Sequence, residues 1–483
     1  MLPQLRTVKR DFRMDETVPI PRRLAEYKRG DKSLFVAITK ASYVVAGPIG
    51  SEFIYMFEDG IPLGAALSNM RAKYGKERES EIRVALTDLL TQIETRQFYQ
   101  HARPREAMAE QTMLIRLTNR CNLRCTHCLV SSSPDWPKEN ELSTDEWLAA
   151  VEQFAAFTSE RGFSKRQITV TGGEALVRQD ALEIAHRSKS LGMYTVLYSN
   201  GVSIASARVA AAIASAVDEL QISFDGATAE VHDAVRGSGM FVRSIRGVDF
   251  LREAGVRFHI AVVVMPQNYD DLLLNLGALV RRLGECFVVK LGMAVKEGRA
   301  TEDMMFRSIA EGEDQIRILI DRLASEGVRA ASPFTPNLKN TSCGYARELT
   351  VDENGLVYGC GPRQFPIGNL KTESFLSIAE RVIGNSRGAE VDLVEGCRDC
   401  NIRYLCGGTC RLNNIARMGR ATISSCDQAE KERRIGVLFG RAANIVPVKV
   451  LVDSLGRLME ARTPTFGVTG HNVVPLSALF QTS

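Results

Sequence analysis

Between about residues 113 and 330, short apolar segments alternate with helix-like segments, and this alternation constrains the fold more than any other feature of the sequence. Six segments have the composition of strands, and each is followed by a stretch with helical spacing of apolar residues. The six are Met113–Thr118, Ile168–Thr171, Thr195–Tyr198, Leu220–Phe224, Phe258–Val264 and Phe287–Met293. Repeated strand–helix units are typical of a parallel sheet with crossover helices. We therefore predict an α/β fold whose ligands bind at the C-terminal ends of the strands.

One helix of this region has a clear start. Ser143 stands three residues before Glu146, and apolar residues follow at helical spacing. This is the pattern of a capping box, in which each of the two side chains bonds the backbone N–H of the other residue. The sequence therefore predicts a helix that begins directly after Ser143.

The first 100 residues contain no cysteine and predict a small domain of strands followed by helices. Leu34, Val36 and Ile38 alternate as in a strand, and the turn Arg29–Asp31 favours a hairpin with Leu24–Tyr27. Further along, apolar residues recur at helical spacing: Ile82, Leu86, Leu89, Leu90 and Ile93. Residues 101–112 are mostly polar and are predicted to be a linker.

Charge and hydropathy narrow the functional classes. The chain has 61 Lys and Arg against 57 Asp and Glu, and this near balance does not favour a general polyanion-binding protein. No apolar run is long enough to span a membrane, and the N-terminus lacks the pattern of a secretory signal, so we expect a cytoplasmic protein. Thiols are normally kept reduced there, which favours metal binding over disulfides for the 11 cysteines.

Three cysteines follow the first predicted strand with the spacing CxxxCxxC: Cys121, Cys125 and Cys128. Thiolates this close together on one loop can hold several corners of one iron–sulfur cubane. Three local ligands leave either a distant fourth ligand or one open iron. The alternative is a zinc site made of the three cysteines and His127.

This spacing, with the aromatic-type residue His127 before the last cysteine, resembles the defining motif of the radical S-adenosylmethionine (SAM) superfamily. The resemblance implies a partial (β/α)6 barrel, a [4Fe–4S] cluster on the three cysteines and SAM on the open iron. In that family one electron from the cluster splits SAM into methionine and a 5′-deoxyadenosyl radical. The cofactors carry this chemistry, while the protein orients them and excludes water.

Residues at the following strand ends resemble the SAM-binding elements of that family. Gly172–Glu174 resemble a GGE element, whose glycines let the backbone approach SAM and whose acid neighbours the SAM ammonium group. Ser199 and Asn200 resemble the ribose-contacting element, and Arg236 resembles the arginine near the SAM carboxylate. The resemblance thus implies eight SAM-binding residues: Gly172, Gly173, Glu174, Ser199, Asn200, Ser223, Asp225 and Arg236. Read without it, each is as well explained by a turn or a helix cap.

Seven further cysteines lie between residues 343 and 426, in a segment with little periodicity. Such a segment buries little apolar surface, so metal binding is expected to supply folding free energy. A zinc ribbon is one interpretation of a CxxC followed by two more cysteines. The full spacing resembles the SPASM domain of peptide-modifying radical SAM enzymes, which holds two auxiliary [4Fe–4S] clusters. The resemblance implies one set of ligands at Cys397, Cys400, Cys406 and Cys426, and another at Cys343, Cys360 and Cys410.

The second set is one cysteine short of four. Sulfatase-maturing relatives carry an extra cysteine just upstream, where this chain has Asn337–Ser342 and no cysteine. Cys286, the remaining cysteine, precedes an apolar strand and is predicted to be a buried structural thiol. An open iron at the incomplete site could bind a substrate thiolate, as proposed for thioether-forming relatives. A water, carboxylate or imidazole ligand is the alternative.

The N-terminal domain resembles the winged-helix recognition element of enzymes that modify ribosomally synthesised peptides, and such domains bind a leader peptide as an added strand. The alternatives are a nucleic-acid-binding winged helix and a purely structural cap. Residues 1–110 hold 18 Lys and Arg and 15 Asp and Glu, which does not favour nucleic acid.

Together these resemblances imply a radical SAM maturase that installs an intramolecular crosslink, either a thioether or a carbon–carbon bond, in a precursor peptide. We expect it to need SAM, three [4Fe–4S] clusters and an electron donor such as flavodoxin or ferredoxin, and to bind neither nucleic acid nor membrane. The sequence does not identify the general base. Two alternatives remain: oxidation of a Cys or Ser in a protein substrate, as in sulfatase maturation, and a non-catalytic iron–sulfur electron carrier.

The predicted domains follow from the same patterns. They are a recognition domain at 1–100, a linker at 101–112, a barrel at 113–330, a SPASM domain at 331–435 and an extension at 436–483. The extension contains a possible strand at Val446–Val452 and has no assigned role.

Overall fold

The computed structural model describes residues 12–99, 110–284, 286–332, 342–361 and 364–442. Their contacts divide them into two compact units. The N-terminal unit contains residues 12–99, 342–343 and 387–442, and the barrel unit contains the other described residues. The segment 331–435, predicted as one SPASM domain, therefore contributes to both units. The possible strand at 446–452 lies outside the described residues.

The N-terminal unit is built on an antiparallel sheet with the strand order β1–β2–β3. Its strands are β1 (Leu24–Arg29), β2 (Lys32–Ala37) and β3 (Ser42–Ala46). Three helices follow: α1 (Pro48–Glu58), α2 (Leu63–Tyr74) and α3 (Glu79–Thr95). The predicted hairpin is confirmed, because Arg29 pairs with Lys32 across a turn in which Gly30 has a φ of +60°.

Both faces of this small sheet are buried, because successive residues of a strand point to opposite faces. Phe35 and Val44 belong to the core that also contains the apolar residues of α1, α2 and α3. Leu34, Val36 and Val45 belong to a second core, which includes residues from the C-terminal part of the same unit. The helices of that part are α12 (Arg403–Cys406), α13 (Arg411–Met418) and α14 (Gln428–Ala442).

The barrel unit contains a ten-stranded sheet with the order β10-β9-β8-β7-β6-β5-β4-β11-β12-β13. Strands β4 to β10 are parallel to one another, and β11 is also parallel to β4. The strands are β4 (Glu110–Arg116), β5 (Lys165–Thr171), β6 (Tyr194–Ser199), β7 (Glu219–Ser223), β8 (Phe258–Val264), β9 (Val289–Met293), β10 (Ala330–Ala331), β11 (Glu348–Val351), β12 (Leu356–Tyr358) and β13 (Gly368–Asn369). This arrangement confirms the predicted α/β fold with a large parallel sheet.

One boundary differs from the prediction. Strand β4 begins at Glu110, so the last three residues of the predicted linker 101–112 belong to the sheet. They pair with Lys165–Gln167, and the Gln111 side chain donates to the carbonyl of Arg347 at 2.9 Å. Polar side chains are satisfied at this position by the neighbouring strands, which the polarity of the sequence alone does not reveal.

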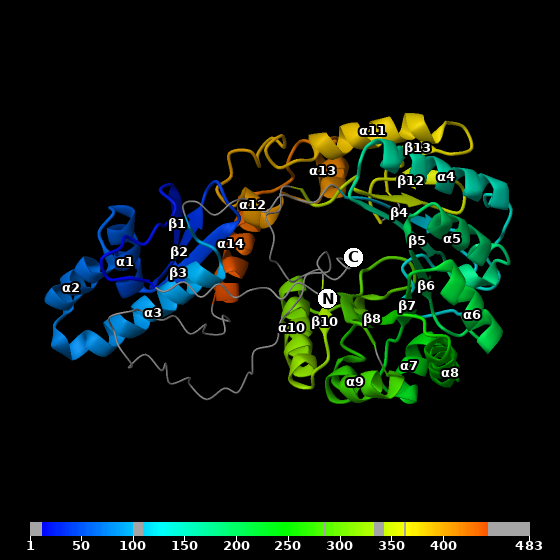
Figure 1. The fold of residues 1–483 in the computed structure, drawn as a ribbon, viewed down its shortest axis with the longest axis horizontal. Coiled ribbons are helices and arrows are strands. Elements are labelled where there is room, and N and C mark those ends of the chain that lie inside the picture. The colour runs from blue at the N-terminus through cyan, green and yellow to red at the C-terminus, as the bar shows by residue number, and fades with distance from the viewer. Residues whose placement is uncertain (1–11, 100–109, 285, 333–341, 362–363, 443–483) are drawn as a thin grey trace. The chain divides into compact units, whose positions relative to one another are not determined.

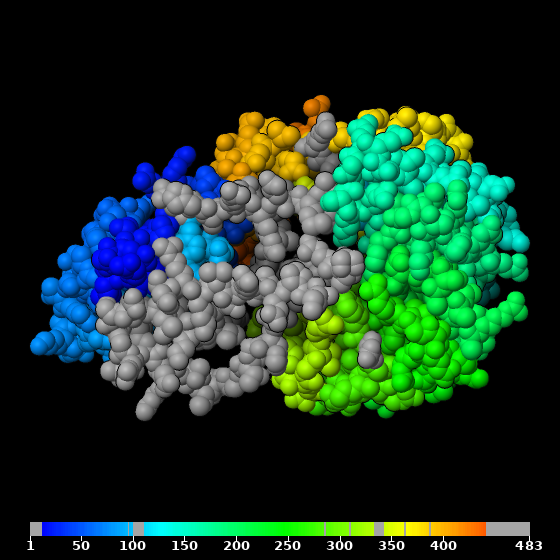
Figure 2. Space-filling view, viewed as in Figure 1, coloured from blue at the N-terminus to red at the C-terminus, as the bar shows by residue number. Residues whose placement is uncertain are grey.

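Helices pack against the sheet, and most of those that connect its parallel strands contact a neighbouring helix (Figure 1). They are α4 (Thr144–Glu160), α5 (Ala181–Ser190), α6 (Ala207–Ala216), α7 (Ala229–Arg236), α8 (Met240–Glu253), α9 (Tyr269–Leu283), α10 (Ile309–Ser325) and α11 (Phe375–Gly388). In the space-filling view the cyan and green segments form one continuous body, as expected for helices that pack over a sheet (Figure 2). No helix in the described ranges combines the length and apolarity needed to cross a bilayer.

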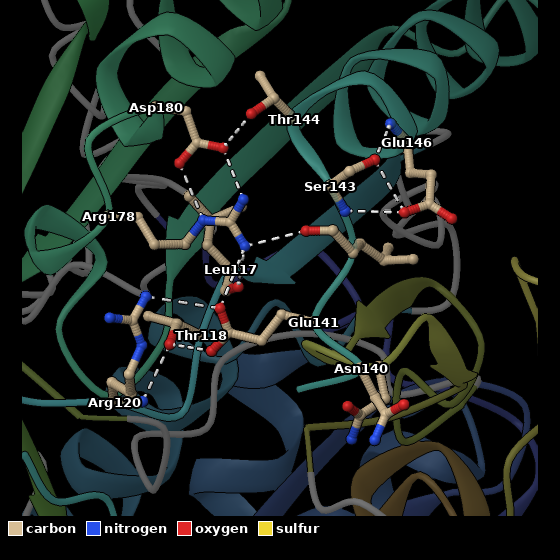
Figure 3. Close-up of polar contacts among 12 residues, drawn as sticks. Leu117, Thr118, Arg120, Asn140, Glu141, Ser143, Thr144, Glu146, Arg178 and Asp180 are labelled. Carbon is tan, nitrogen blue, oxygen red and sulfur yellow. Dashed lines mark hydrogen bonds and ion pairs between the residues drawn. The ribbon is translucent and has the colours of Figure 1, made fainter. Parts of the chain in front are cut away.

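The predicted capping box at the start of α4 is confirmed (Figure 3). The Ser143 hydroxyl accepts from the backbone N–H of Glu146 at 3.3 Å, and the Ser143 N–H donates to the Glu146 carboxylate at 2.7 Å. Further along the helix, Phe154 and Phe157 pack edge-on against Phe375 of α11. Helix α4, which connects β4 to β5, therefore packs against the helix that follows β13.

Replacing Ser143 with alanine should lower the free energy of unfolding of the barrel unit by about 1 kcal/mol, because the backbone N–H of Glu146 loses the hydroxyl that caps it. The chain's two tryptophans, Trp136 and Trp147, both lie in this unit, so urea denaturation followed by tryptophan fluorescence measures the change. Ser143→Thr, which keeps the hydroxyl, is the control. Equal losses in the two variants would contradict a capping role.

Candidate functional site

The loop that carries the first three cysteines starts directly after β4. Its two ends meet, because the Cys121 N–H donates to the Ser133 carbonyl at 3.0 Å. Cys121 is 7% exposed and packs with Leu123, Val202 and Cys125. Burial raises the pKa of the Cys121 thiol to about 12, so it binds as a thiolate only if a cation compensates the charge.

A glycine and an arginine after β9 hold this loop in place, and the sequence analysis did not identify them. A Cβ at Gly298, whose φ is +65°, would lie 2.1 Å from the Cys128 carbonyl oxygen, so no larger residue fits. The Arg299 guanidinium donates to the carbonyls of Cys125 at 2.9 Å and Ser132 at 2.8 Å. A Gly-Arg pair shortly after a barrel strand is the only local signal that could have pointed to this contact.

Gly172 and Gly173 lie against the start of the cysteine loop. A Cβ on Gly172 would lie 2.5 Å from the Thr118 carbonyl oxygen, and one on Gly173 would lie 2.4 Å from the Arg120 carbonyl oxygen. The Gly173 N–H donates to Thr118 at 2.8 Å, and the Glu174 N–H donates to Arg120 at 3.0 Å. The glycines are therefore required by this backbone contact, and their predicted approach to SAM remains a prediction.

The carboxylate of Glu174 is fixed by the end of the neighbouring strand. It accepts from the Ser199 hydroxyl at 3.0 Å and from the Asn200 N–H at 2.8 Å, and the residue is 1% exposed. Burial raises the pKa of Glu174, and these hydrogen bonds oppose the rise. The Asn200 amide donates to Asn122 at 2.8 Å, so the predicted residues of β5 and β6 are joined to the cysteine loop.

Asp225, at the end of β7, forms the most buried ion pair of the site. It accepts from Arg236 Nε and Nη2, both at 2.7 Å, and from His127 Nε2 at 2.9 Å. Burial alone would raise the pKa of Asp225, but Arg236 and His127 outweigh this effect and hold it well below its usual range. His127 thus links the cysteine motif to β7, while Ser223 is half-buried at the end of that strand.

A second buried network contacts the start of the loop and was not predicted (Figure 3). The Arg178 guanidinium donates to Asp180 at 2.6 Å, to the carbonyls of Leu117 and Leu142 at 3.0 Å each, and to Glu141 at 3.4 Å. Glu141 also accepts from the hydroxyl of Thr118. This network joins the end of β4, the segment before α4 and the turn after Glu174.

Four cysteines of the N-terminal unit surround one cavity. The cavity measures about 250 Å³, and its lining includes Cys397, Cys400, Cys406, Cys426 and Arg434. In the described ranges, no three His, Cys, Asp or Glu side chains meet closely enough to share a single metal ion. Sulfur donors spaced around a cavity fit a cluster of several irons, whose ligands are spread more widely than those of one ion. The structure therefore brings together the predicted ligands of one auxiliary cluster.

The other predicted ligands are less confined. Cys343 and Cys410 are exposed and belong to the N-terminal unit, whereas Cys360 is half-buried and belongs to the barrel unit. Their shared ligation remains a prediction. Cys286, predicted to be buried, is half-buried. Its thiol donates to the Val288 carbonyl at 3.3 Å, and exclusion of water raises the pKa of the thiol to about 12.

Part of the barrel unit is similar to a known protein family. Residues 115–276 match the family model described as the Radical SAM superfamily. The chain is 27% identical to the AdoMet-dependent heme synthase of Oleidesulfovibrio alaskensis over 336 residues, which covers 63% of this chain and 83% of that protein. It is also 27% identical to the PqqA peptide cyclase of Ruegeria pomeroyi over 354 residues, covering 68% and 90% of the two proteins.

Among solved structures, the fold is similar to Streptococcus suis SuiB bound to precursor peptide SuiA. The TM-score is 0.52, the sequence identity is 13%, and the match covers 85% of this chain and 99% of that one. This likeness agrees with the α/β fold and its large parallel sheet, and the match to the radical SAM model applies to residues 115–276.

Replacing Arg178 with methionine should lower the free energy of unfolding by about 3 to 5 kcal/mol, because Glu141 is left as a buried charge with fewer partners. The double variant Arg178→Met with Glu141→Gln should recover at least about 1 kcal/mol of this loss, since the residues are coupled. Urea denaturation followed by tryptophan fluorescence tests both. Strictly additive effects would show that the two side chains act independently.

The pH dependence of stability should reveal His232, which is fully buried between Phe224 and Phe241. Burial and the positive charge of Arg236 lower the pKa of His232 to about 4. Between pH 6.5 and 5 the unfolded chain therefore binds a proton that the folded chain does not, and the free energy of unfolding falls by about 2 kcal/mol. In His232→Phe this part of the fall should disappear, and an unchanged pH dependence would contradict the assignment.

Proposed function

We propose that this chain, whose barrel unit contains a radical SAM domain, is a peptide maturase that joins two residues of a ribosomally synthesised precursor peptide. The observation that carries the proposal is the convergence at one edge of the sheet. There the cysteine loop after β4 is linked by hydrogen bonds and ion pairs to Glu174, Asn200 and Asp225 at the ends of the next three strands.

The residues present fit a [4Fe–4S] cluster and SAM. Cys121, Cys125 and Cys128 would hold the cluster, which with SAM supplies a 5′-deoxyadenosyl radical that removes hydrogen from carbon. The chain itself orients and shields this chemistry. Arg299 and the Arg178 network fix the cysteine loop, Ser199 and Asn200 aim the Glu174 carboxylate, and Asp225 neutralises Arg236 in a dry environment.

Two features support a peptide substrate. The alignment with PqqA peptide cyclase covers 90% of that protein, and the solved fold similar to this chain was determined with a precursor peptide bound. The three-stranded N-terminal sheet, followed by α1, α2 and α3, has the arrangement expected of a leader-binding domain, in which a peptide adds a strand. Tethering a leader there would raise the local concentration of the core peptide at the barrel.

The bond formed is proposed from the cysteines of the second region. The auxiliary clusters would accept the surplus electron when the substrate radical closes onto a second residue. If the site of Cys343, Cys360 and Cys410 keeps one open iron, it would bind a substrate thiolate and lead to a thioether. Mössbauer spectra that show four cysteine ligands on every auxiliary cluster without substrate would contradict this step.

A second candidate is a radical reaction on a small molecule. The observation that favours it is the alignment with an AdoMet-dependent heme synthase over 83% of that protein. Both candidate functions use the radical SAM domain, and they differ in the substrate on which it acts. The hypothesis of a peptide substrate also explains the N-terminal sheet domain and the seven cysteines after residue 342.

Anaerobically reconstituted protein, reduced and given SAM, should release 5′-deoxyadenosine. Single alanine substitutions at Cys121, Cys125 or Cys128 should reduce the release to background, because each removes a cluster ligand. Glu174→Gln should raise the Kd for SAM about tenfold, since the cationic ammonium group loses its charged partner. Cys286→Ala is the matched cysteine control and should retain wild-type release. Release by the cysteine variants would contradict the site.

Substrate class is tested by co-expression with any short open reading frame encoded beside the gene, followed by tandem mass spectrometry. A crosslink predicts a loss of two hydrogens located between two residues of the peptide. An unmodified peptide from cells whose enzyme cleaves SAM would count against the peptide reading and in favour of a small-molecule substrate.

A further inference from the structure

One helix contacts both the cavity lined by four cysteines and the N-terminal sheet. None of the roles described above requires this double contact. Helix α14 contributes Arg434 to the cavity that the four cysteines line. The same helix contributes the buried Leu438 to the second core, with Ile435 and Phe439 packed beside it. The sheet face that carries this second core, opposite to α1, α2 and α3, is called the outer face. One helix therefore contacts both the predicted iron–sulfur site and strand β3.

The polar side of the helix reaches a cluster ligand directly. The Arg434 guanidinium donates from Nη1 to the Cys406 sulfur at 2.8 Å and from Nε to Glu430 at 2.6 Å. Glu430 lies one turn before Arg434 on the helix and holds the guanidinium in this orientation. A cation that donates to a ligand sulfur stabilises the more negative, reduced state of a cluster.

The apolar side of the contact also comes from the cysteine segment itself. Ile402 is 2% exposed and lies in the same core as Leu34, Val36 and Val45 of the sheet. Cys400, Leu405 and Cys406 pack against this core. A Cβ on Gly436 would lie 2.7 Å from Arg29 Nη1, so the side chain of Arg29, the last residue of β1, reaches α14.

These contacts have an energetic consequence. The cysteine segment has only short helices, so its conformation depends on what the cysteines bind. The cysteine segment and α14 pack on the outer face of the sheet. This packing forms only when the cysteine segment has a fixed conformation.

We propose that helix α14 couples the auxiliary-cluster site to the N-terminal sheet. A cluster on Cys397, Cys400, Cys406 and Cys426 stabilises the outer face of β2 and β3, and Arg434 raises the reduction potential of that cluster through Cys406. The inference rests on the proposed auxiliary cluster. Because coupling is reciprocal, a ligand that orders the sheet also strengthens retention of the cluster.

Hydrogen exchange of the reconstituted full chain tests the coupling. Cys426→Ala removes a ligand that is exposed and lies outside the core on the sheet, so it changes the cluster without removing a packing contact. Peptides covering β2 and β3 should then exchange about tenfold faster or more. Cys121→Ala is the matched control: it removes a ligand in the barrel unit and should leave exchange in β2 and β3 unchanged.

Iron analysis separates the two ways in which this test can fail. If Cys426→Ala loses one cluster's iron and β2 and β3 exchange as in the wild type, the coupling is wrong and the proposed cluster stands. If the variant keeps all its iron and the electron paramagnetic resonance spectrum of its auxiliary clusters is unchanged, Cys426 is not a ligand. The proposed ligand set is then wrong, and the coupling is wrong with it.

Redox titration followed by electron paramagnetic resonance tests Arg434. With Cys121→Ala as background to remove the radical-site signal, Arg434→Met should lower the midpoint potential of the auxiliary cluster, and Arg434→Lys should lower it less. Arg433→Met is the control, because Arg433 bonds Glu430 at 2.8 Å and does not line the cavity. An unchanged potential in Arg434→Met, with α14 still protected from exchange, would overturn this role.

Discussion

The site depends on a backbone contact between the segments that follow β4 and β5. The N–H groups of Gly173 and Glu174 donate to the carbonyls of Thr118 and Arg120. A Cβ on Gly172 or Gly173 would collide with these carbonyls. The cysteine loop therefore starts at a fixed place relative to the next strand. The contacts of Glu174 with Asn200 and of Asn200 with Asn122 build on this one.

Buried charges around the loop are paired, and the pairing has a structural use. Asp225 binds Arg236 and His127, and Arg178 binds Asp180 and Glu141. Isolated charges at these depths would be costly, so each group constrains the position of its partner. These ion pairs restrict the position of the loop, as the proposed binding of a cluster and SAM would require.

The cysteine-rich C-terminal segment does not form a separate body. Its first part adds β11 to the parallel sheet beside β4, and its second part covers one face of the N-terminal sheet. Sequence periodicity favours division into consecutive domains, because it reports local structure. Contacts between residues more than 300 positions apart, such as Val45 with the core that includes Leu438, are not visible in it.

The sequence by itself determined the α/β fold, the hairpin, the capping box at Ser143 and the cysteine groups, because each depends on neighbours within about ten residues or on residue type alone. The resemblance of its motifs to SAM-binding elements also pointed to Glu174, Asn200 and Asp225. Only the tertiary structure decided what these residues touch. Arg178, Gly298, Arg299 and Arg434 act through contacts with loops far away in the chain, and an arginine or glycine in a loop has no pattern that announces such a partner. The same reason explains why the predicted SPASM segment became part of two units: burial of an apolar face is satisfied by whichever surface the folded chain presents, and the sequence does not state which one that is.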